Sequence, residues 1–145
     1  MIGLLQRVSH ADVAVDGAVI ARIERGILVL VGVERDDDDA KAERLAERLL
    51  TYRVFPDDAG KMNLDVLAVG GGVLLVPQFT LAADTGSGTR ASFTTAAEPA
   101  VARARYDQLV AAVKRRLPSV QSGRFGADMQ VRLTNDGPVT FSLRV

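Results

Sequence analysis

The sequence contains no cysteine and only one histidine, His10, among its 145 residues. The absence of cysteine excludes disulfide bonds, thiolate nucleophiles and cysteine metal sites, and one histidine is too few for a histidine-rich metal site. We therefore expect neither a metal nor a cofactor. His10 lies in the polar segment 9–12, so we interpret it as a surface residue rather than a catalytic base.

Excess charge of either sign is also missing. The 18 basic and 18 acidic residues cancel, which argues against a broad electrostatic surface for nucleic acid but leaves open a local contact with one end of an RNA. No segment has the ~18 consecutive apolar residues of a membrane span, and the first ten residues lack the pattern of a secretory signal. These absences predict a cytoplasmic protein with no membrane partner.

The length and the 48% hydrophobic content suit one core and one domain over residues 1–145. Apolar alternation predicts a first strand at 1–8 and a hairpin that turns at Asp16-Gly17. Two apolar runs predict further strands, 27–33 at the centre of the sheet and 73–79 after a flexible glycine turn. Helices are expected after the acidic run 36–39 and between Glu98-Pro99 and Pro118. This order indicates a mainly antiparallel α+β fold.

The segment NDGPVT at 135–140 stands between two alternating runs, and this pattern predicts a C-terminal hairpin. The Asp136-Gly137 pair already suffices for a hairpin turn, so Pro138, which cannot donate a backbone hydrogen bond, needs a separate explanation. It leaves nearby carbonyl groups without a donor. The residues alone favour a proline that stiffens the turn and begins an edge strand.

A nucleophile with a nearby base cannot be recognised. Thr80, at the end of the 73–79 strand, is the best-placed hydroxyl, yet without a basic partner it is only weakly nucleophilic. The glycine triplet at 70–72 lacks the Lys-Ser/Thr ending of a phosphate-binding loop. The carboxylates lie mainly at helix starts and turns, and no pair is spaced as an acid–base dyad. Catalysis by side chains is therefore not derivable from the residues.

Several short motifs occur in one order along the chain: QRVS at 6–9, GKMNL at 60–64, PQFTLAADT at 77–85, FGADM at 125–129 and NDGPVT at 135–140. Each is weak alone, but together they closely resemble the D-aminoacyl-tRNA deacylases, which remove D-amino acids mischarged onto tRNA. The resemblance implies a D-tyrosyl-tRNA deacylase-like fold with a barrel-like core and two principal helices. It also implies a hydrolase of translation quality control, and an obligate homodimer whose active site lies at the subunit interface.

The resemblance assigns roles to individual residues. Gly137 and Pro138 match a glycyl-cis-prolyl pair whose carbonyl oxygens enter the partner's site, bind the substrate's α-amino group and exclude an L side chain. Gln78, Phe79 and Thr80 match the opposite wall, around the ester and the 3′-terminal adenosine of tRNA. Backbone N–H groups there would stabilise the oxyanion, and Thr80 would position the substrate rather than attack it. The terminal ribose 2′-OH would assist the reaction.

Three more residues acquire roles in this way. Phe125 and Met129 match residues that line the adenine pocket, and Arg7 matches the residue that supports the glycyl-proline pair. Taken alone, these residues are typical of a core aromatic, a core thioether and a surface cation. The expected substrates are D-aminoacyl-tRNA and glycyl-tRNA, because achiral glycine escapes the steric rejection of L side chains.

The chain departs from the family pattern at Pro77, where serine is usual, and in the loop 84–92, where Gly86 replaces arginine and Ala91 replaces proline. The first change removes a hydroxyl and a backbone N–H, and the others reduce contacts to tRNA phosphates. Two alternatives therefore stay open beside the hydrolase. One is a noncatalytic dimer that binds an RNA end or a nucleotide, and the other is a purely structural dimer.

Overall fold

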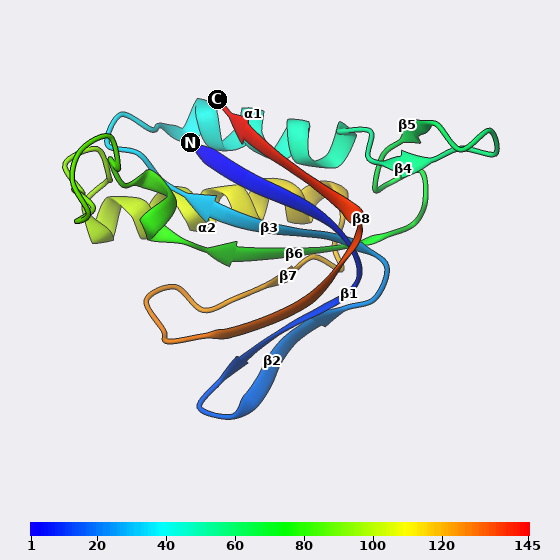
Figure 1. Cartoon of the computed structure of the whole chain (residues 1–145), viewed down its shortest axis with the longest axis horizontal. Helices are drawn as coiled ribbons and strands as arrows, with labels where there is room; N and C mark the ends of the chain where they lie inside the picture. The colour runs from blue at the N-terminus through cyan, green and yellow to red at the C-terminus, as the bar shows by residue number, and fades with distance from the viewer.

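The fold is organised around one long strand at the start of the chain. In the computed structural model, which describes residues 1–145, this strand is β1 (Ile2–Val15). One edge of β1 pairs with β8 (Gln130–Arg144), and the other pairs first with β3 (Gly26–Gly32) and then with β2 (Ala18–Ile23), always antiparallel. Figure 1 shows β1 curving from the N-terminus to its hairpin with β2. The strands thereby form the predicted barrel-like sheet.

Parallel pairing completes the sheet. β6 (Gly72–Pro77) runs parallel to β3, and the short β7 (Gln121–Ser122) runs parallel to β6, so the order is β2-β1-β3-β6-β7 with β8 on the other edge of β1. β4 (Phe55–Pro56) and β5 (Met62–Leu64) form a separate antiparallel pair. The α+β prediction is confirmed, with β3, β6 and β7 as a parallel portion of a mainly antiparallel arrangement.

The two helices begin where the sequence predicts. α1 (Asp39–Thr51) is capped by Asp38, whose side chain accepts a 2.9 Å hydrogen bond from the Lys41 backbone N–H, so the acidic run is a helix start. α2 (Pro99–Arg116) has its proline at the first position, where the missing N–H has no helical acceptor to lose. Neither helix is long and apolar enough to cross a membrane.

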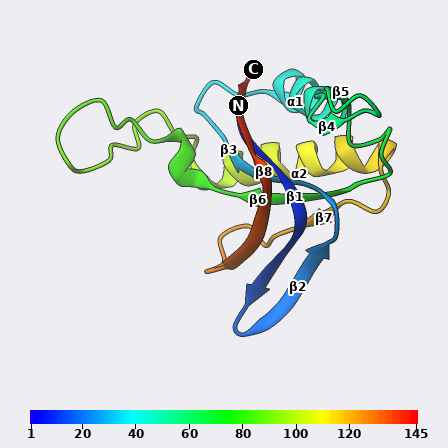
Figure 2. The same cartoon turned by 45° about the vertical axis from the view of Figure 1, so that its right-hand side comes forward.

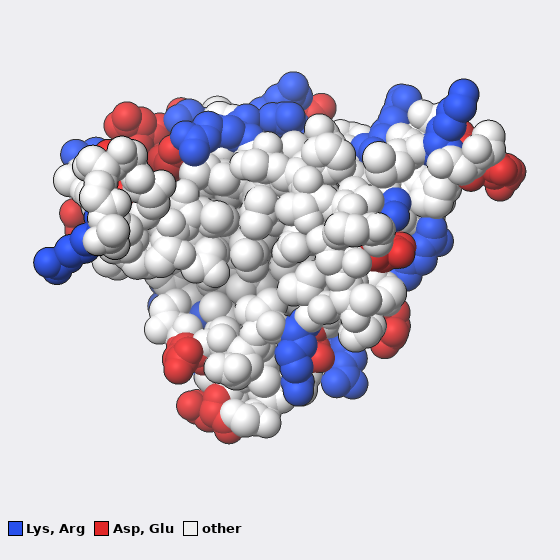
Figure 3. Space-filling model, viewed as in Figure 1, with Lys and Arg blue, Asp and Glu red and all other residues white.

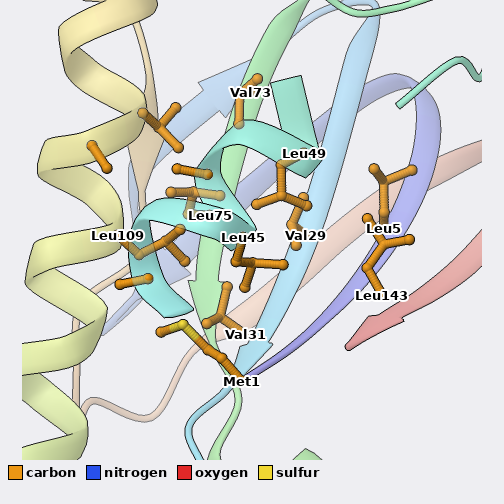
Figure 4. Close-up of a cluster of buried hydrophobic side chains, with 14 of the residues drawn as sticks. Met1, Leu5, Val29, Val31, Leu45, Leu49, Val73, Leu75, Leu109 and Leu143 are labelled. Atoms are coloured by element: carbon orange, nitrogen blue, oxygen red, sulfur yellow. The ribbon is translucent and has the colours of Figure 1, made fainter. Parts of the chain in front are cut away.

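Both helices pack on one face of the sheet. Figure 4 shows Leu45 and Leu49 of α1 and Leu109 of α2 directed onto Val29 and Leu75 of the central strands. The opposite face carries a second, smaller core, closed by the curvature of β1 and β2 and by the first half of β8. β3 is therefore covered on both sides, which explains its unbroken apolar run.

Close backbone contact explains one glycine of the triplet at 70–72. Gly70 has a φ of +61° and makes the predicted turn, but Gly72 begins β6 directly beside Gly26 of β3. A Cβ atom on Gly26 would lie 2.0 Å from the Gly72 carbonyl oxygen. The triplet is thus only partly a flexible turn, because its last residue is already packed in the sheet.

The predicted C-terminal hairpin is wrong. Residues 130–134 pair with β1 from Ala14 to His10, and residues 140–144 continue along β1 from Gln6 to Ile2, so both halves belong to one strand running in one direction. Between the pairs His10↔Thr134 and Gln6↔Thr140, β8 uses two more residues than β1. Because side chains alternate between the two faces of a strand, two extra residues do not change which face the later residues occupy. A strand with this bulge therefore has the same alternation of apolar and polar residues as a hairpin.

The strand predicted to reach Phe79 ends at Pro77 instead. Gln78 donates its backbone N–H to the Val31 carbonyl at 2.7 Å, and the chain then turns into the short 3₁₀ helix η1 (Phe79–Ala82). Pro77 cannot donate to a ladder, which agrees with its place at a strand end. The turn carries residues 78–80 across the end of β3.

The GKMNL motif is structural. It forms the β4–β5 turn, in which Asp57 accepts hydrogen bonds from the backbone N–H groups of Ala59 and Lys61 and from the Asn63 side chain, each at 2.8–2.9 Å. The Asn63 amide contributes most to holding the pKa of Asp57 below its usual value, followed by the Lys61 N–H. This hairpin lies apart from the site described below.

Candidate active site

A pocket of about 600 Å³ opens where five segments meet: the connection between β3 and α1, the end of β6, η1, the stretch from Phe93 to the start of α2, and the stretch from Phe125 to Val131. Most of its lining is apolar. Arg35 and Glu98 are the charged residues of that lining. A concave, mainly apolar pocket with few polar groups is the usual form of a small-molecule or nucleobase site.

Two exposed aromatic rings form one wall. Phe79 of η1 and Phe93 of the segment before α2 are 53% and 41% exposed, and their rings stack with centroids 4.4 Å apart. Figure 2 shows the segment between η1 and α2 extending away from the body of the fold. The stack of Phe93 on Phe79 joins the end of this segment to η1. Exposed stacked rings offer a surface on which a base can stack.

The opposite wall contains Phe125 and Met129. Met129 is held in place by the Arg124 backbone N–H, which lies 3.4 Å from its sulfur, and by Gly123, where a Cβ would come within 2.9 Å of that sulfur. Phe125 packs against Tyr106, with ring centroids 6.1 Å apart. The Tyr106 hydroxyl donates to the Leu75 carbonyl at 2.9 Å, and burial raises the pKa of Tyr106 well above its usual value.

Gln78, Phe79 and Thr80 stand at the edge of this pocket. Gln78 and Phe79 line it, while Thr80 is exposed and accepts a 2.6 Å hydrogen bond from the Gln78 side-chain amide. No basic group contacts the Thr80 hydroxyl, so nothing activates it as a nucleophile. The N–H groups of Phe79 and Thr80 are at the start of η1, where backbone donors lack an intrahelical acceptor.

Gly137, Pro138 and Arg7 form a second group, in the bulge of β8. The Gly137–Pro138 peptide bond is cis, and both residues are exposed. Arg7 Nε donates to the Asp136 carbonyl at 3.0 Å and Nη1 donates to the Val54 carbonyl at 2.6 Å. Arg7 is therefore not a free surface cation: it attaches the bulge to the body of the fold. None of these residues lines the pocket.

The Asn135 side chain holds the other end of the bulge. It donates to the Thr140 hydroxyl at 2.7 Å and accepts from the Val139 backbone N–H at 2.9 Å. Gly137 has a φ of +133°, and a Cβ there would lie 2.7 Å from the Val139 side chain and 3.0 Å from Arg7 Nη2. Only glycine fits this position without displacement. The bulge thus presents a tightly held stretch of backbone.

A family model described as D-Tyr-tRNA(Tyr) deacylase matches residues 4–144, which is nearly the whole chain. The chain belongs to this family. A D-aminoacyl-tRNA deacylase from Janthinobacterium sp. (strain Marseille) is 59% identical over 145 residues, covering 100% of this chain and 97% of the relative. One from Vibrio parahaemolyticus is also 59% identical, with 100% of both chains covered. The predicted family and enzyme class, a hydrolase of the D-aminoacyl-tRNA deacylase type, are confirmed.

Solved structures agree with this deacylase fold. The c-Myc DNA Unwinding Element Binding Protein superposes with a TM-score of 0.95 at 35% identity, covering 100% of this chain and 99% of that one. A probable eukaryotic D-amino acid tRNA deacylase superposes with a TM-score of 0.85 over 98% of each chain, and at 18% identity it bears on the fold alone.

Several pocket residues of this deacylase family member escaped the sequence analysis. The one sequence feature that distinguishes Phe93 is that it is the single aromatic residue of a polar segment. Arg35 and Glu98 lie near the starts of helices, where charged residues have an ordinary structural explanation. Pro77, the departure from the family motif, also lines the pocket. Arg90 is exposed. His10 is likewise exposed and bonds only Ser9 and Thr134.

Proposed function

We propose that the protein hydrolyses the ester bond of D-aminoacyl-tRNA and releases the free amino acid and tRNA. The observation that carries the proposal is the aromatic pocket beside residues 78–80 in a chain of the deacylase family. The terminal adenosine would lie between the Phe79–Phe93 stack and the wall of Phe125 and Met129, which places its 3′ ester next to Gln78 and Thr80. The enzyme would act in the cytoplasm, in translation quality control.

The ester is cleaved by addition of water to the carbonyl carbon, after which the bond to the ribose 3′-oxygen breaks and that oxygen takes up a proton. The backbone N–H groups of Phe79 and Thr80 are the donors for the oxyanion that forms in between. One such donor is worth about 10²–10³ in rate. Since no basic side chain accompanies Thr80, the neighbouring ribose 2′-OH assists proton movement in this proposal.

A second copy of the chain completes the proposed site. The carbonyl groups of Gly137 and Pro138 do not line the pocket of their own chain, so in a homodimer they would enter the partner's pocket. There they would accept hydrogen bonds from the substrate's α-amino group and occupy the space of an L side chain. In support, Figure 3 shows the middle of the face over β1 and β8 almost free of charged side chains, which is common in subunit interfaces.

The decisive test compares D-tyrosyl-tRNA with L-tyrosyl-tRNA. The parent protein is expected to deacylate the D ester and to leave the L ester intact over the same time, because a fixed wall rejects a misplaced side chain more strongly than apolar fit can. Release of radiolabelled tyrosine at one enzyme concentration measures both rates. Equal turnover of the two esters would rule out a chirality filter, and the Pro138→Ala variant shows whether any selectivity depends on this prolyl residue.

Glycyl-tRNA should also be hydrolysed. Glycine has no side chain to meet the Gly137–Pro138 carbonyls, so the wall that excludes L residues does not exclude it. L-alanyl-tRNA is the matched chiral substrate. When the two are assayed side by side, deacylation is expected for glycyl-tRNA and not for L-alanyl-tRNA. Complete resistance of glycyl-tRNA would contradict rejection by steric exclusion.

One observation favours a second candidate function. Pro77 lines the pocket in place of the family's serine and brings neither a hydroxyl nor a backbone N–H. If the reaction needs either group, the protein binds the aminoacylated RNA end without cleaving it. Saturable binding of D-tyrosyl-tRNA with the ester intact identifies that outcome, and the Pro77→Ser variant would then recover hydrolysis.

A further inference from the structure

Arg35 stands at the mouth of the pocket, on the connection between β3 and α1. It lines the pocket and is exposed, so its side chain lies where the cavity meets solvent. The backbone around it is fixed: the Arg35 N–H donates to the Thr95 carbonyl at 2.9 Å, and the Ala97 N–H donates to the Val33 carbonyl at 3.1 Å. The backbone from which the Arg35 side chain extends is therefore fixed beside the segment that carries Phe93.

No carboxylate neutralises Arg35. Its neighbour Glu34 bonds the N-terminal amine and Arg144, and Asp37 bonds the same amine and Lys41. The Arg35 side chain takes part in no ion pair or side-chain hydrogen bond, although it has five donors. An uncommitted arginine on a fixed backbone is available to an external anion.

The larger group of cations on α1 differs in this respect. Lys41 pairs with Asp37, Arg44 pairs with Glu47, and Arg144, which lies beside them, pairs with Glu34. Arg48 has no carboxylate partner, but its guanidinium donates to the Arg144 backbone carbonyl at 2.9 Å. Figure 3 shows blue and red side chains close together along that rim of the molecule. These cations are partly neutralised within the chain, whereas Arg35 is the only cation in the pocket lining.

We propose that Arg35 binds the phosphate that joins the terminal adenosine to the preceding nucleotide. This inference rests on the proposed function, since it assumes that the adenosine occupies the pocket. An apolar cavity takes the base, but the charged phosphate must stay at the hydrated mouth. Glu98, the other charged lining residue, repels a phosphate, so the phosphate lies on the side of Arg35. A guanidinium binds phosphate oxygens through paired hydrogen bonds.

The test uses two small substrates that differ only in this phosphate: 3′-D-tyrosyl-adenosine and its 5′-monophosphate. The parent is expected to favour the phosphorylated substrate about tenfold in kcat/KM, mainly through KM, the effect of one charged hydrogen-bond contact at a hydrated site. Arg35→Gln should remove this preference, so that the kcat/KM values of the two substrates agree within about twofold. Arg35→Lys should retain part of it, because the charge remains.

Arg124→Gln is the matched control. Arg124 is exposed and directly precedes Phe125, but it does not line the pocket, so its loss should leave the preference unchanged. With D-tyrosyl-tRNA itself, Arg35→Gln should make the slope of log kcat/KM against log salt less steep by about 0.7, the value for one phosphate contact on a single strand. Thermal unfolding of each variant checks that the fold is kept.

The outcomes separate the two proposals. A parent that hydrolyses neither small substrate nor D-tyrosyl-tRNA refutes the proposed function and the role of Arg35 with it. A parent that hydrolyses them without preferring the phosphate, or a preference that survives in Arg35→Gln, refutes only the role of Arg35. Loss of the preference in Arg35→Gln, with Arg124→Gln unaffected, supports it.

Discussion

A D-tyrosyl-tRNA that ends in 2′-deoxyadenosine should be hydrolysed by this protein at least about 100-fold more slowly than the natural substrate, since general acid–base assistance contributes about 10²–10⁴. The pocket supplies no histidine, and the Thr80 hydroxyl accepts its hydrogen bond from an amide, which is not a base. In the proposed function, the substrate's own 2′-OH would then relay the proton. Single-turnover rates, each divided by the spontaneous rate of the same ester, measure the effect.

Glu98 provides the companion test. Its side chain is the one carboxylate in the pocket lining, so it is the alternative to the RNA hydroxyl as a base. If the 2′-OH and not Glu98 relays the proton, Glu98→Gln should retain hydrolysis of natural D-tyrosyl-tRNA within about threefold, while the 2′-deoxy substrate stays slow with either protein. The reverse pattern, a fast 2′-deoxy substrate and an inactive Glu98→Gln variant, would show that the protein and not the RNA supplies the base.

Gly137→Ala should abolish most of the activity on D-tyrosyl-tRNA, with a loss of about 100-fold or more. The added Cβ meets the Val139 side chain at 2.7 Å and Arg7 Nη2 at 3.0 Å, and a φ of +133° is strained for alanine. The bulge must shift, and a misplacement of ~1 Å in a substrate-positioning group costs about 10²-fold. Deacylation of the D and L esters measures both rate and selectivity.

Gly60→Ala is the control for the cost of the backbone conformation alone. Gly60 also has a positive φ, +77°, but a Cβ there meets no atom within 4 Å. Both variants are strained as alanines, yet only the one at position 137 displaces the bulge. Comparable activity in the two variants, with comparable unfolding temperatures, would contradict the role given to the glycyl-prolyl carbonyls.

Mixing Gly137→Ala with Phe79→Ala, which should lose activity because it removes one aromatic wall of the pocket, tests whether the site is shared between subunits. In a heterodimer of Gly137→Ala and Phe79→Ala protomers, one pocket carries both defects and the other carries neither. Co-expressed or refolded mixtures should therefore regain activity that neither homodimer has. A mixture that stays inactive after subunit exchange has been demonstrated would place the complete site within one chain.

The helices and the central strand could be predicted because their signals are local. The run at 27–33 is apolar on both faces, and Asp38 stands where a helix cap belongs. The C-terminal strand could not be told from a hairpin. The two extra residues of β8 preserve the alternation, and only long-range pairing with β1 decides between the two.

The site was predictable only in part. Phe125 and Met129 follow from the family resemblance, and the structure places both with Gln78 and Phe79 around one pocket. Arg35 and Phe93 reach that pocket from separate segments that adjoin through the Glu34↔Ala96 bridge, a contact without a local sequence signal. The separation of Gly137 and Pro138 from the pocket likewise depends on the whole sheet.

The two-sided attachment of the bulge has a mechanical consequence. The tip of a hairpin is attached to the fold at one end only, so a small rotation at the base of the hairpin displaces the tip by a large distance. The Gly137–Pro138 carbonyls instead lie in the middle of a segment that is attached at both ends, because β8 is hydrogen-bonded to β1 on both sides of them. Arg7 adds a third attachment through its hydrogen bonds to the Asp136 and Val54 carbonyls. In the proposed dimer, a larger substrate side chain would displace such a segment less easily than it would a hairpin tip. In the proposed function, exclusion of an L residue would then require no closing motion and would be in place before the substrate arrives.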